Sequence, residues 1–192
     1  MNKKFYSRKQ NRLPTYDYSE NGYYYITVCT HNQQELFGSI ENDKMILNEY
    51  GKIIKDTWLK IPAHFTNVDL DEYIIMSNHI HGIIQIVGAR LPRPNEDIND
   101  NVIGRGNPAP TLGQIIAYFK YKSTKQINES RSTPGRKIWQ RNYYDHVIRN
   151  DKSLSNIREY IVNNPLTWGA DENNPMNYKI TVQAGLPTGR QA

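Results

Sequence analysis

The segment Tyr73-Ile-Ile-Met-Ser-Asn-His-Ile-His-Gly-Ile-Ile-Gln-Ile-Val87 has the composition of two β-strands joined by a turn at Ser77 and Asn78. Side chains alternate between the two faces of a strand, so His79 and His81 point to the same side. The residues that point to the opposite side are Ile80, Gly82, Ile84 and Ile86. One face of this strand therefore belongs to a hydrophobic core, while the other carries two imidazoles. We expect the hairpin to lie at the centre of a sheet.

The pair of histidines allows two interpretations. One imidazole can be a hydrogen-bonded core residue and the other a surface residue, or both can bind a metal ion or a phosphate. Two imidazoles on one face of an apolar strand favour the second interpretation. Cys29 is the single cysteine, which excludes an internal disulfide and zinc sites built from cysteine clusters. A metal ion would therefore be held by nitrogen and oxygen ligands.

The chain has 192 residues, a length for which one domain is the simplest expectation. It has no apolar run near the ~20 residues that cross a bilayer. Its first residues include no apolar segment resembling a signal peptide. We expect a cytoplasmic, nucleoid-associated protein with no membrane partner.

Positive charge and aromatic rings occur together in this sequence. The formal net charge is +5, and basic residues are concentrated in the segments 3–12 and 118–149. Cations interleaved with flat rings are typical of proteins that bind single strands, because phosphates pair with the cations and bases stack on the rings. A solvated basic face beside an ordinary aromatic core would have the same composition. The candidate nucleic-acid-binding residues are Tyr118, Lys120, Tyr121, Lys122, Lys125, Arg136, Lys137, Arg141 and Arg149.

Hydrophobic periodicity predicts the other elements. Strands are predicted over 23–30, 36–40 and 44–47, and amphipathic helices over 48–61, 111–127 and 152–163. Asp151 or Ser153 is the expected N-cap of the last helix, which Pro165 closes. Elements in this order predict an α+β sandwich with helices on one face of the sheet and the histidines on the other.

Composition also suggests the domain boundaries. We expect a basic tail over 1–22, one domain over 23–168, and a polar, frayed tail over 169–192. The segment 89–110 is rich in proline, glycine and asparagine, so a flexible loop is expected there.

A third metal ligand should come from outside the histidine strand. The chain has no HExxH motif, no glutamate shortly after His81 as in cupin-type sites, and no second His-x-Ser/Thr as in paired-histidine phosphodiesterases. Tyr160 and Asn164 are four residues apart and so project from one side of the last helix. An Asn164 carbonyl can bind a metal, and a Tyr160 hydroxyl can attack a phosphate if the site activates it. Alternatively, Tyr160 caps the core and Asn164 caps the helix end.

These residues carry a resemblance to a known family. Met76-Ser-Asn-His-Ile-His-Gly-Ile-Ile84 resembles the histidine–hydrophobe–histidine signature of HUH nucleases. The segment 138–149 followed by 160–168 resembles the C-terminal half of the REP-associated tyrosine transposases, relatives of the single-strand transposases of small insertion sequences. The match covers roughly 23–168 in order and spacing. Ser77 stands where the family often has proline.

The resemblance implies a ferredoxin-like antiparallel sheet with helices on one face and an HUH-type active site on the opposite face. It implies that His79 and His81 bind the metal, that Tyr160 is the nucleophile and that Asn164 is the third ligand. The implied cofactor is Mg²⁺ or Mn²⁺. The implied reaction cleaves and rejoins single-stranded or hairpin DNA through a 5′-phosphotyrosine, in a monomer or a homodimer.

Two other functions remain open from the sequence. The same sheet and basic segments would serve a domesticated protein that binds structured DNA or RNA without cutting it. A metal hydrolase of small phosphoesters would use the same metal ligands, but the basic and aromatic surface disfavours it.

Overall fold

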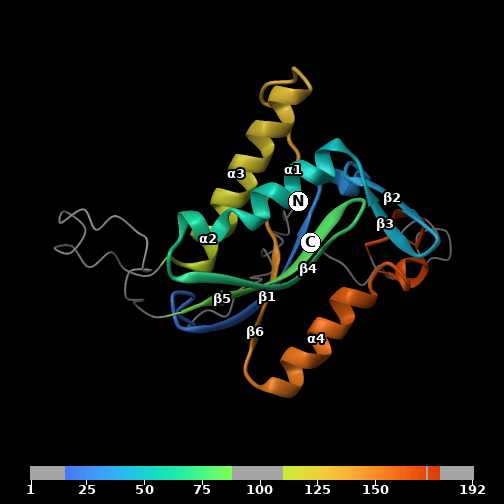
Figure 1. Ribbon diagram of the computed structural model, residues 1–192. Coiled ribbons are helices and arrows are strands. Elements are labelled where there is room, and N and C mark those ends of the chain that lie inside the picture. The colour runs from blue at the N-terminus through green and yellow to red at the C-terminus, as the bar shows by residue number, and fades with distance from the viewer. Residues whose placement is uncertain (1–15, 88–109, 172, 178–192) are drawn as a thin grey trace, which may run out of the picture.

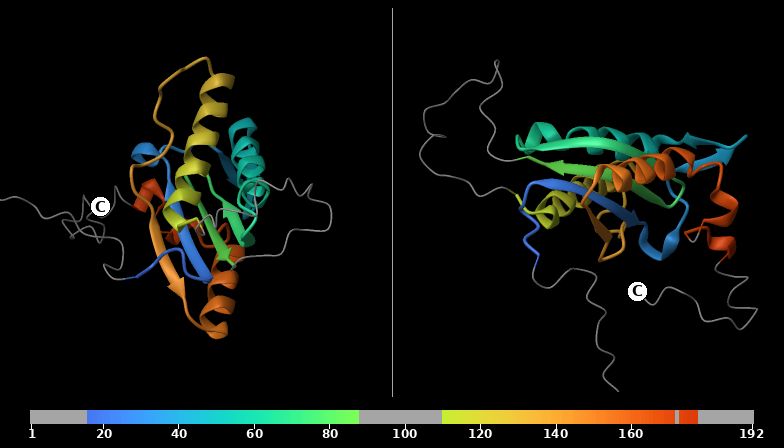
Figure 2. Two further views of the ribbon diagram at one scale, coloured as in Figure 1. Left: turned by 90° about the vertical axis from the view of Figure 1, so that its left-hand side faces the viewer. Right: turned by 90° about the horizontal axis from the view of Figure 1, so that it is seen from below.

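A four-stranded antiparallel sheet is the centre of the molecule. The computed structural model describes residues 16–87, 110–171 and 173–177. The strands are β1 (Gly22–Cys29), β4 (Val68–Ile75), β5 (His79–Ile86) and β6 (Tyr144–Ile148). They lie in the order β4-β5-β1-β6. Figure 2 shows β6 and β4 at opposite edges, so of the predicted hairpin only β5 is central, and β4 is an edge strand.

This topology is ferredoxin-like. Helix α1 (Glu49–Leu59) connects β1 to β4, and α3 (Leu112–Ser130) connects β5 to β6. The first connection leaves room for β5 between β1 and β4, and the second places β6 on the other side of β1 from β5. The predicted α+β class and ferredoxin-like sheet are therefore confirmed. Small additions are the hairpin of β2 (Gly38–Glu41) and β3 (Lys44–Leu47), the short helix α2 (Ile61–His64), and the 3-10 turns at His31–Gln33 and Trp168–Ala170.

The helices begin where the sequence supplies a cap. Asn48 accepts a hydrogen bond from the amide of Gly51 at the start of α1. Thr111 and Gln114 form a reciprocal capping box at the start of α3. The last helix, α4 (Asp151–Asn163), is capped by Asn150, whose side chain accepts from the Ser153 amide at 2.8 Å. The predicted caps Asp151 and Ser153 are thus wrong, because Asn150 is the extended residue before the first turn.

One face of the sheet is covered by α1 and α3, as predicted. Figure 1 shows both helices above the sheet. Trp58 of α1 lies so close to β5 that a Cβ atom on Gly82 would be 2.5 Å from Trp58 Cζ2. Glycine at 82 therefore lets the largest core side chain reach the strand backbone.

The opposite face carries the histidines and also α4, which lies below the sheet in Figure 1. Leu154 and Ile161 of α4 pack on Ile83 and Ile148 in a second apolar cluster. The prediction that the helices lie on one face of the sheet therefore holds for α1 and α3, while α4 packs on the face that carries the histidines. This placement brings the last helix to the candidate site.

Both predicted tails are shorter than composition suggested. Tyr18 is buried in the core, and Tyr16 packs against it. Asp171, Asn173 and Asn174 are also buried, so the expectation of a frayed tail from 169 is wrong for its first residues. The segment 3–12 and the predicted loop, up to residue 109, lie outside the described residues. Within the described ranges, no helix combines the length and apolarity needed to cross a membrane.

Candidate active site

His79 and His81 converge on one point beneath α4. Both side chains are buried, and their Nε2 atoms are 3.0 Å apart. The register of β5 against β1 places Cys29 opposite His79 and Thr27 opposite His81. The predicted shared orientation of the two imidazoles is therefore confirmed.

The outer nitrogen of His79 is held by its neighbour in sequence. His79 Nδ1 lies 2.7 Å from Asn78 Oδ1. The Asn78 amide group donates to the backbone oxygen of Asn173 at 2.8 Å, which orients Oδ1 toward the imidazole. Because that oxygen can only accept, His79 carries its proton on Nδ1 and its Nε2 lone pair faces His81.

The outer nitrogen of His81 faces two hydroxyl groups of β1. His81 Nδ1 is 2.7 Å from the Tyr25 hydroxyl and 2.9 Å from Thr27 Oγ1. The Tyr25 ring also stacks on the imidazole, with centroids 5.6 Å apart. Burial raises the pKa of Tyr25, so its hydroxyl stays protonated, and its oxygen can accept a hydrogen bond from the Nδ1–H of a His81 whose Nε2 lone pair faces the site. These contacts fix the ring of His81 with Nε2 toward the site.

Tyr160 extends from α4 to the same point. Its hydroxyl lies 3.4 Å from His81 Nε2 and donates to Asp171 Oδ2 at 3.3 Å. The side chain is 42% exposed, so one side of the ring is open to a substrate. Tyr160 comes from the same chain as the histidines it approaches. The structure thus joins the two halves of the predicted site, and the alternative role of Tyr160 as a core cap does not fit its exposure.

Asn164, the predicted third ligand, lies one helical turn further along. It is fully buried, and its Nδ2 donates to Asp171 Oδ2 at 2.9 Å. Its Oδ1 is a buried acceptor with no hydrogen-bond partner. Leaving such an atom unpaired costs about 1–3 kcal/mol, so its position is best explained by a ligand to that oxygen. Whether that ligand is a metal ion stays a prediction.

Asp171 is the site residue that sequence reasoning missed. His79, His81 and Asp171 each offer one potential ligand atom, and these three atoms lie within 4.8 Å of one another. All three residues are buried. The carboxylate is oriented by the backbone N–H of Asn173, which donates to Oδ1 at 2.6 Å. Asp171 follows Asn164 by seven residues in a polar segment, and no motif spacing marks it. Its burial depends on the turn after α4.

Two imidazole nitrogens and one carboxylate are a donor set that suits a divalent cation. His79 presents an Nε2 lone pair, and Asn164 Oδ1 adds a nearby acceptor that needs a partner. A cation between these groups would bind both Nε2 lone pairs and replace the hydrogen bond of 3.0 Å that joins the two imidazoles. The residues present therefore fit a metal ion, with oxygen ligands that Mg²⁺ accepts and imidazoles that favour Mn²⁺.

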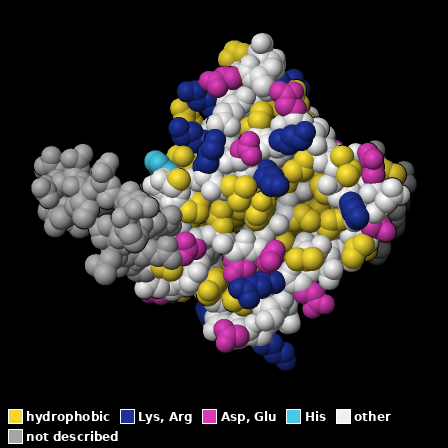
Figure 3. All heavy atoms as spheres, viewed as in Figure 1, with side chains coloured by type: hydrophobic (Ala, Val, Ile, Leu, Met, Phe, Trp, Pro, Cys, Tyr) yellow, Lys and Arg dark blue, Asp and Glu magenta, His cyan; other side chains and the backbone are white. Residues whose placement is uncertain are grey.

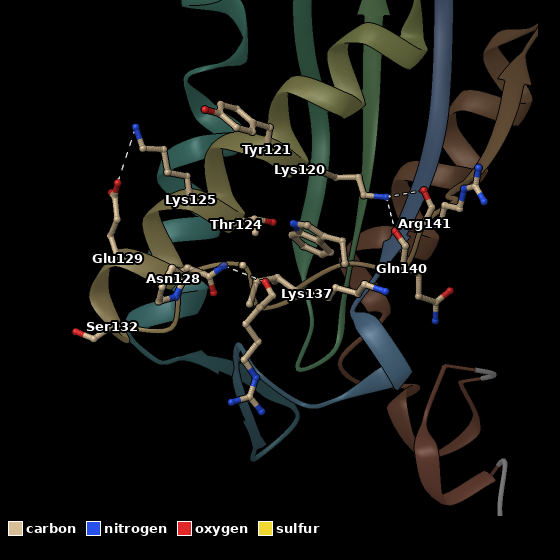
Figure 4. A pocket seen from close by; sticks show the side chains of 15 residues that line it. Lys120, Tyr121, Thr124, Lys125, Asn128, Glu129, Ser132, Lys137, Gln140 and Arg141 are labelled. Atoms are coloured by element: carbon tan, nitrogen blue, oxygen red, sulfur yellow. Dashed lines mark hydrogen bonds and ion pairs between the residues drawn. The ribbon is translucent and has the colours of Figure 1, made fainter.

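The candidate nucleic-acid-binding residues fall into two groups. Figure 3 shows Lys and Arg side chains gathered over α3. Six candidates line one cavity beside α3, namely Lys120, Tyr121, Lys125, Arg136, Lys137 and Arg141 (Figure 4). The other three lie elsewhere: Tyr118 stacks on His64, with Lys122 over its ring, and Arg149 follows β6. Sequence proximity alone did not separate these groups.

Two bacterial proteins are similar to this chain in sequence. An uncharacterised protein of Haemophilus influenzae is 38% identical over 167 residues, which cover 86% of this chain and 92% of that protein. A second Haemophilus influenzae protein, named as a candidate REP-associated tyrosine transposase, is 29% identical over 161 residues. That alignment covers 80% of this chain and 75% of the relative. No protein-family model matches the chain.

The fold is similar to that of a solved transposase structure. A REP-associated tyrosine transposase bound to a REP hairpin matches with a TM-score of 0.53 and 16% identity. The match covers 94% of this chain and 91% of that chain. At this identity the likeness concerns the ferredoxin-like sheet and the arrangement of its helices.

Proposed function

We propose that the chain is a member of the REP-associated tyrosine transposase family, and that it cleaves and rejoins hairpin-containing single-stranded DNA by transesterification; its likeness to a relative of that name and to the fold of a solved member supports this. The observation that carries the proposal is the position of Tyr160. Its hydroxyl touches both His81 and Asp171, so a nucleophile and a set of metal ligands meet in one chain. A binding protein without catalysis would not need this convergence.

The proposed metal ligands are His79 Nε2, His81 Nε2 and Asp171, with Asn164 Oδ1 as a further oxygen donor. Bound there, Mg²⁺ or Mn²⁺ would polarise a phosphodiester and offset the charge that develops on it. Asn78, Tyr25 and Thr27 hold the imidazoles from outside, which keeps the nitrogen lone pairs directed at the phosphate region.

Tyr160 forms the new bond in the proposed reaction. Its oxygen attacks the phosphorus of a phosphodiester, and the bond from phosphorus to the 3′ oxygen breaks. The tyrosine loses one proton and the departing 3′ oxygen gains one, so the products are a 5′-phosphotyrosine and a free 3′-OH. One phosphoester bond replaces another, and attack by a 3′-OH on the adduct restores the DNA without ATP.

Covalent trapping tests this function. Wild-type protein is incubated with a library of labelled hairpin oligonucleotides and Mn²⁺, and products are separated under denaturing conditions. We expect a protein–DNA adduct whose peptide, mapped by mass spectrometry, contains Tyr160. Tight hairpin binding with no adduct in Mg²⁺ or Mn²⁺ would favour the non-cleaving binder instead. Turnover of a small phosphoester with no adduct would favour the hydrolase.

A further inference from the structure

Lys120 occupies an unusual position for a lysine. Its side chain starts from the middle of α3, and its Nζ donates to the backbone oxygen of Gln140 and, at 3.0 Å, to that of Arg141. The side chain thereby ties α3 to the segment 132–141, as Figure 4 shows. Both acceptors are uncharged main-chain carbonyls, so these two bonds do not require a charged donor.

A neutral amine at Lys120 can keep both hydrogen bonds. An ammonium has three N–H groups, whereas an amine has two N–H groups and one lone pair, which points away from the two carbonyls. Burial lowers the pKa of Lys120 from its ordinary value of 10.5 to about 8, and the nearby Cys29 opposes part of that shift. At neutral pH roughly a tenth of the Lys120 side chains are therefore amines, compared with about a thousandth or less for an ordinary lysine.

A cavity gives small molecules access to this amine. Its volume is about 740 Å³, and Lys120 lines it together with the segment 132–141 (Figure 4). Pockets for small molecules usually measure about 300–1,000 Å³. His79, His81 and Tyr160 do not line the cavity, so a reaction at Lys120 would take place apart from the candidate active site.

The walls of the cavity favour an anionic reagent. Four more cationic side chains line it beside Lys120, which are Lys125, Arg136, Lys137 and Arg141. Glu129 is the single acidic residue in the lining, and it lies 3.8 Å from Lys125. Cations gathered in a concave site raise the local concentration of anions, and guanidinium groups bind phosphate oxygens well. An electrophile that carries a phosphate group would therefore be concentrated beside the amine.

We propose that Lys120 is a modification site, at which its amine is acylated by small acyl phosphates that the cations of the cavity bind. Nζ attacks the carbonyl carbon of the acyl group, and the bond from that carbon to the bridging oxygen breaks. Phosphate leaves with the electron pair and takes up the proton that Nζ loses, so the products are an amide and inorganic phosphate. The proposal does not depend on the function proposed for Tyr160.

Acylation would change the cavity in two ways. It removes one positive charge from the lining, which lowers the attraction of the cavity for any further anion. It also leaves Nζ with a single hydrogen, so only one of the Gln140 and Arg141 oxygens keeps its donor. The contact between α3 and the segment 132–141 would become weaker.

Competition between lysines of the same protein tests the proposal. The full wild-type chain is incubated with acetyl phosphate at about pH 7.5, and acetylated peptides are quantified over time by mass spectrometry. Lys120 should react at least about tenfold faster than Lys52, an exposed lysine of α1. The rate at Lys120 should level off above about pH 8, whereas an ordinary lysine gains amine up to about pH 10. A rate at Lys120 equal to or below that of Lys52 would overturn the proposal.

A charge variant tests the part that the cations play. Arg141→Gln removes one cation and keeps the backbone oxygen that accepts from Lys120. It should slow acetylation of Lys120 by acetyl phosphate about threefold or more and leave acetylation by acetic anhydride, a neutral reagent, unchanged. Lys44→Gln, at an exposed position of β3, is the control for net charge. Equal slowing with both reagents, or slowing with neither, would show that the cations do not recruit the acyl phosphate and would overturn the proposed class of reagent.

Discussion

The Tyr160 hydroxyl lies 3.4 Å from His81 Nε2 within one chain, although 79 positions separate the two residues. The candidate site therefore combines distant parts of the chain. The sheet supplies the imidazoles, α4 supplies the hydroxyl and the turn after α4 supplies the carboxylate. Each contributor can be changed separately.

Removal of the Tyr160 hydroxyl should abolish covalent adducts and spare DNA binding. Tyr160→Phe keeps the ring contacts with Tyr25 and His81 but has no oxygen to attack phosphorus. Tyr144→Phe is the control, because Tyr144 is exposed and also borders Tyr25. Adducts are counted on denaturing gels and binding by fluorescence anisotropy. Normal adduct formation by Tyr160→Phe would transfer the role to another tyrosine.

Asp171, which the sequence analysis did not select, should contribute directly to metal binding. Asp171→Asn removes a charged ligand, so Mn²⁺ affinity measured by calorimetry should fall by about tenfold or more. Asn164→Ala should also weaken binding, because it removes the proposed oxygen ligand Oδ1 as well as the N–H donor to Asp171 Oδ2. Asp43→Asn, in the turn between β2 and β3, controls for the lost charge. Unchanged Mn²⁺ affinity in Asp171→Asn would favour Asn164, and not Asp171, as the third protein ligand of the metal.

The hydroxyl of Tyr25 should act through His81. Tyr25→Phe keeps the stacked ring and removes the group 2.7 Å from His81 Nδ1. We expect a loss of about tenfold in Mn²⁺ affinity with little change in hairpin binding, since the imidazole is less firmly oriented. Tyr23→Phe, two residues earlier on β1, is the control. Equal metal affinity in both variants would show that Thr27 alone orients the ring.

The ion pair of Asp71 and Arg158 should tie α4 to β4 in a pH-dependent way. Arg158 forms two hydrogen bonds with the carboxylate and holds the pKa of Asp71 below its usual value. The pair therefore stabilises the fold above the unfolded pKa, about 3.9, and its contribution is lost as pH falls through the folded pKa.

Arg158→Met should lower the free energy of unfolding at pH 7 by roughly 0.5–1 kcal/mol, a modest value because part of Arg158 faces solvent. The difference should shrink in urea titrations at about pH 2, where the carboxyl is protonated. Lys152→Met on the same helix is the control for charge. A loss of equal size at both pH values would indicate packing of the arginine stem as its cause.

A methyl group at position 82 should destabilise the core. Gly82→Ala would place Cβ 2.5 Å from Trp58 Cζ2, and neither the strand nor the buried ring can shift freely. We expect a loss of about 1–3 kcal/mol in urea unfolding. Gly169→Ala, where no atom lies within 4 Å of the added carbon, should be nearly neutral. Equal stability of the two variants would mean that Trp58 repacks at no cost.

The sequence predicts those features that depend on neighbouring residues. Alternation along β5 separates the core isoleucines from the imidazoles, and periodicity locates α1, α3 and α4. The four-residue step from Tyr160 to Asn164 places both on one side of a helix. The prediction of the N-cap of α4 was less accurate, because only the extended backbone of Asn150 distinguishes it from Asp151 as the capping residue.

The sequence by itself therefore determined which residues share a strand face or a helix side, since backbone geometry sets those periods. Only the tertiary structure decided that α4 crosses the histidine face, that Asp171 turns back into the site, and that six of the nine candidate cationic and aromatic residues line one cavity. These relations join residues far apart in the chain. They depend on how apolar faces pack together, and no local spacing encodes the result.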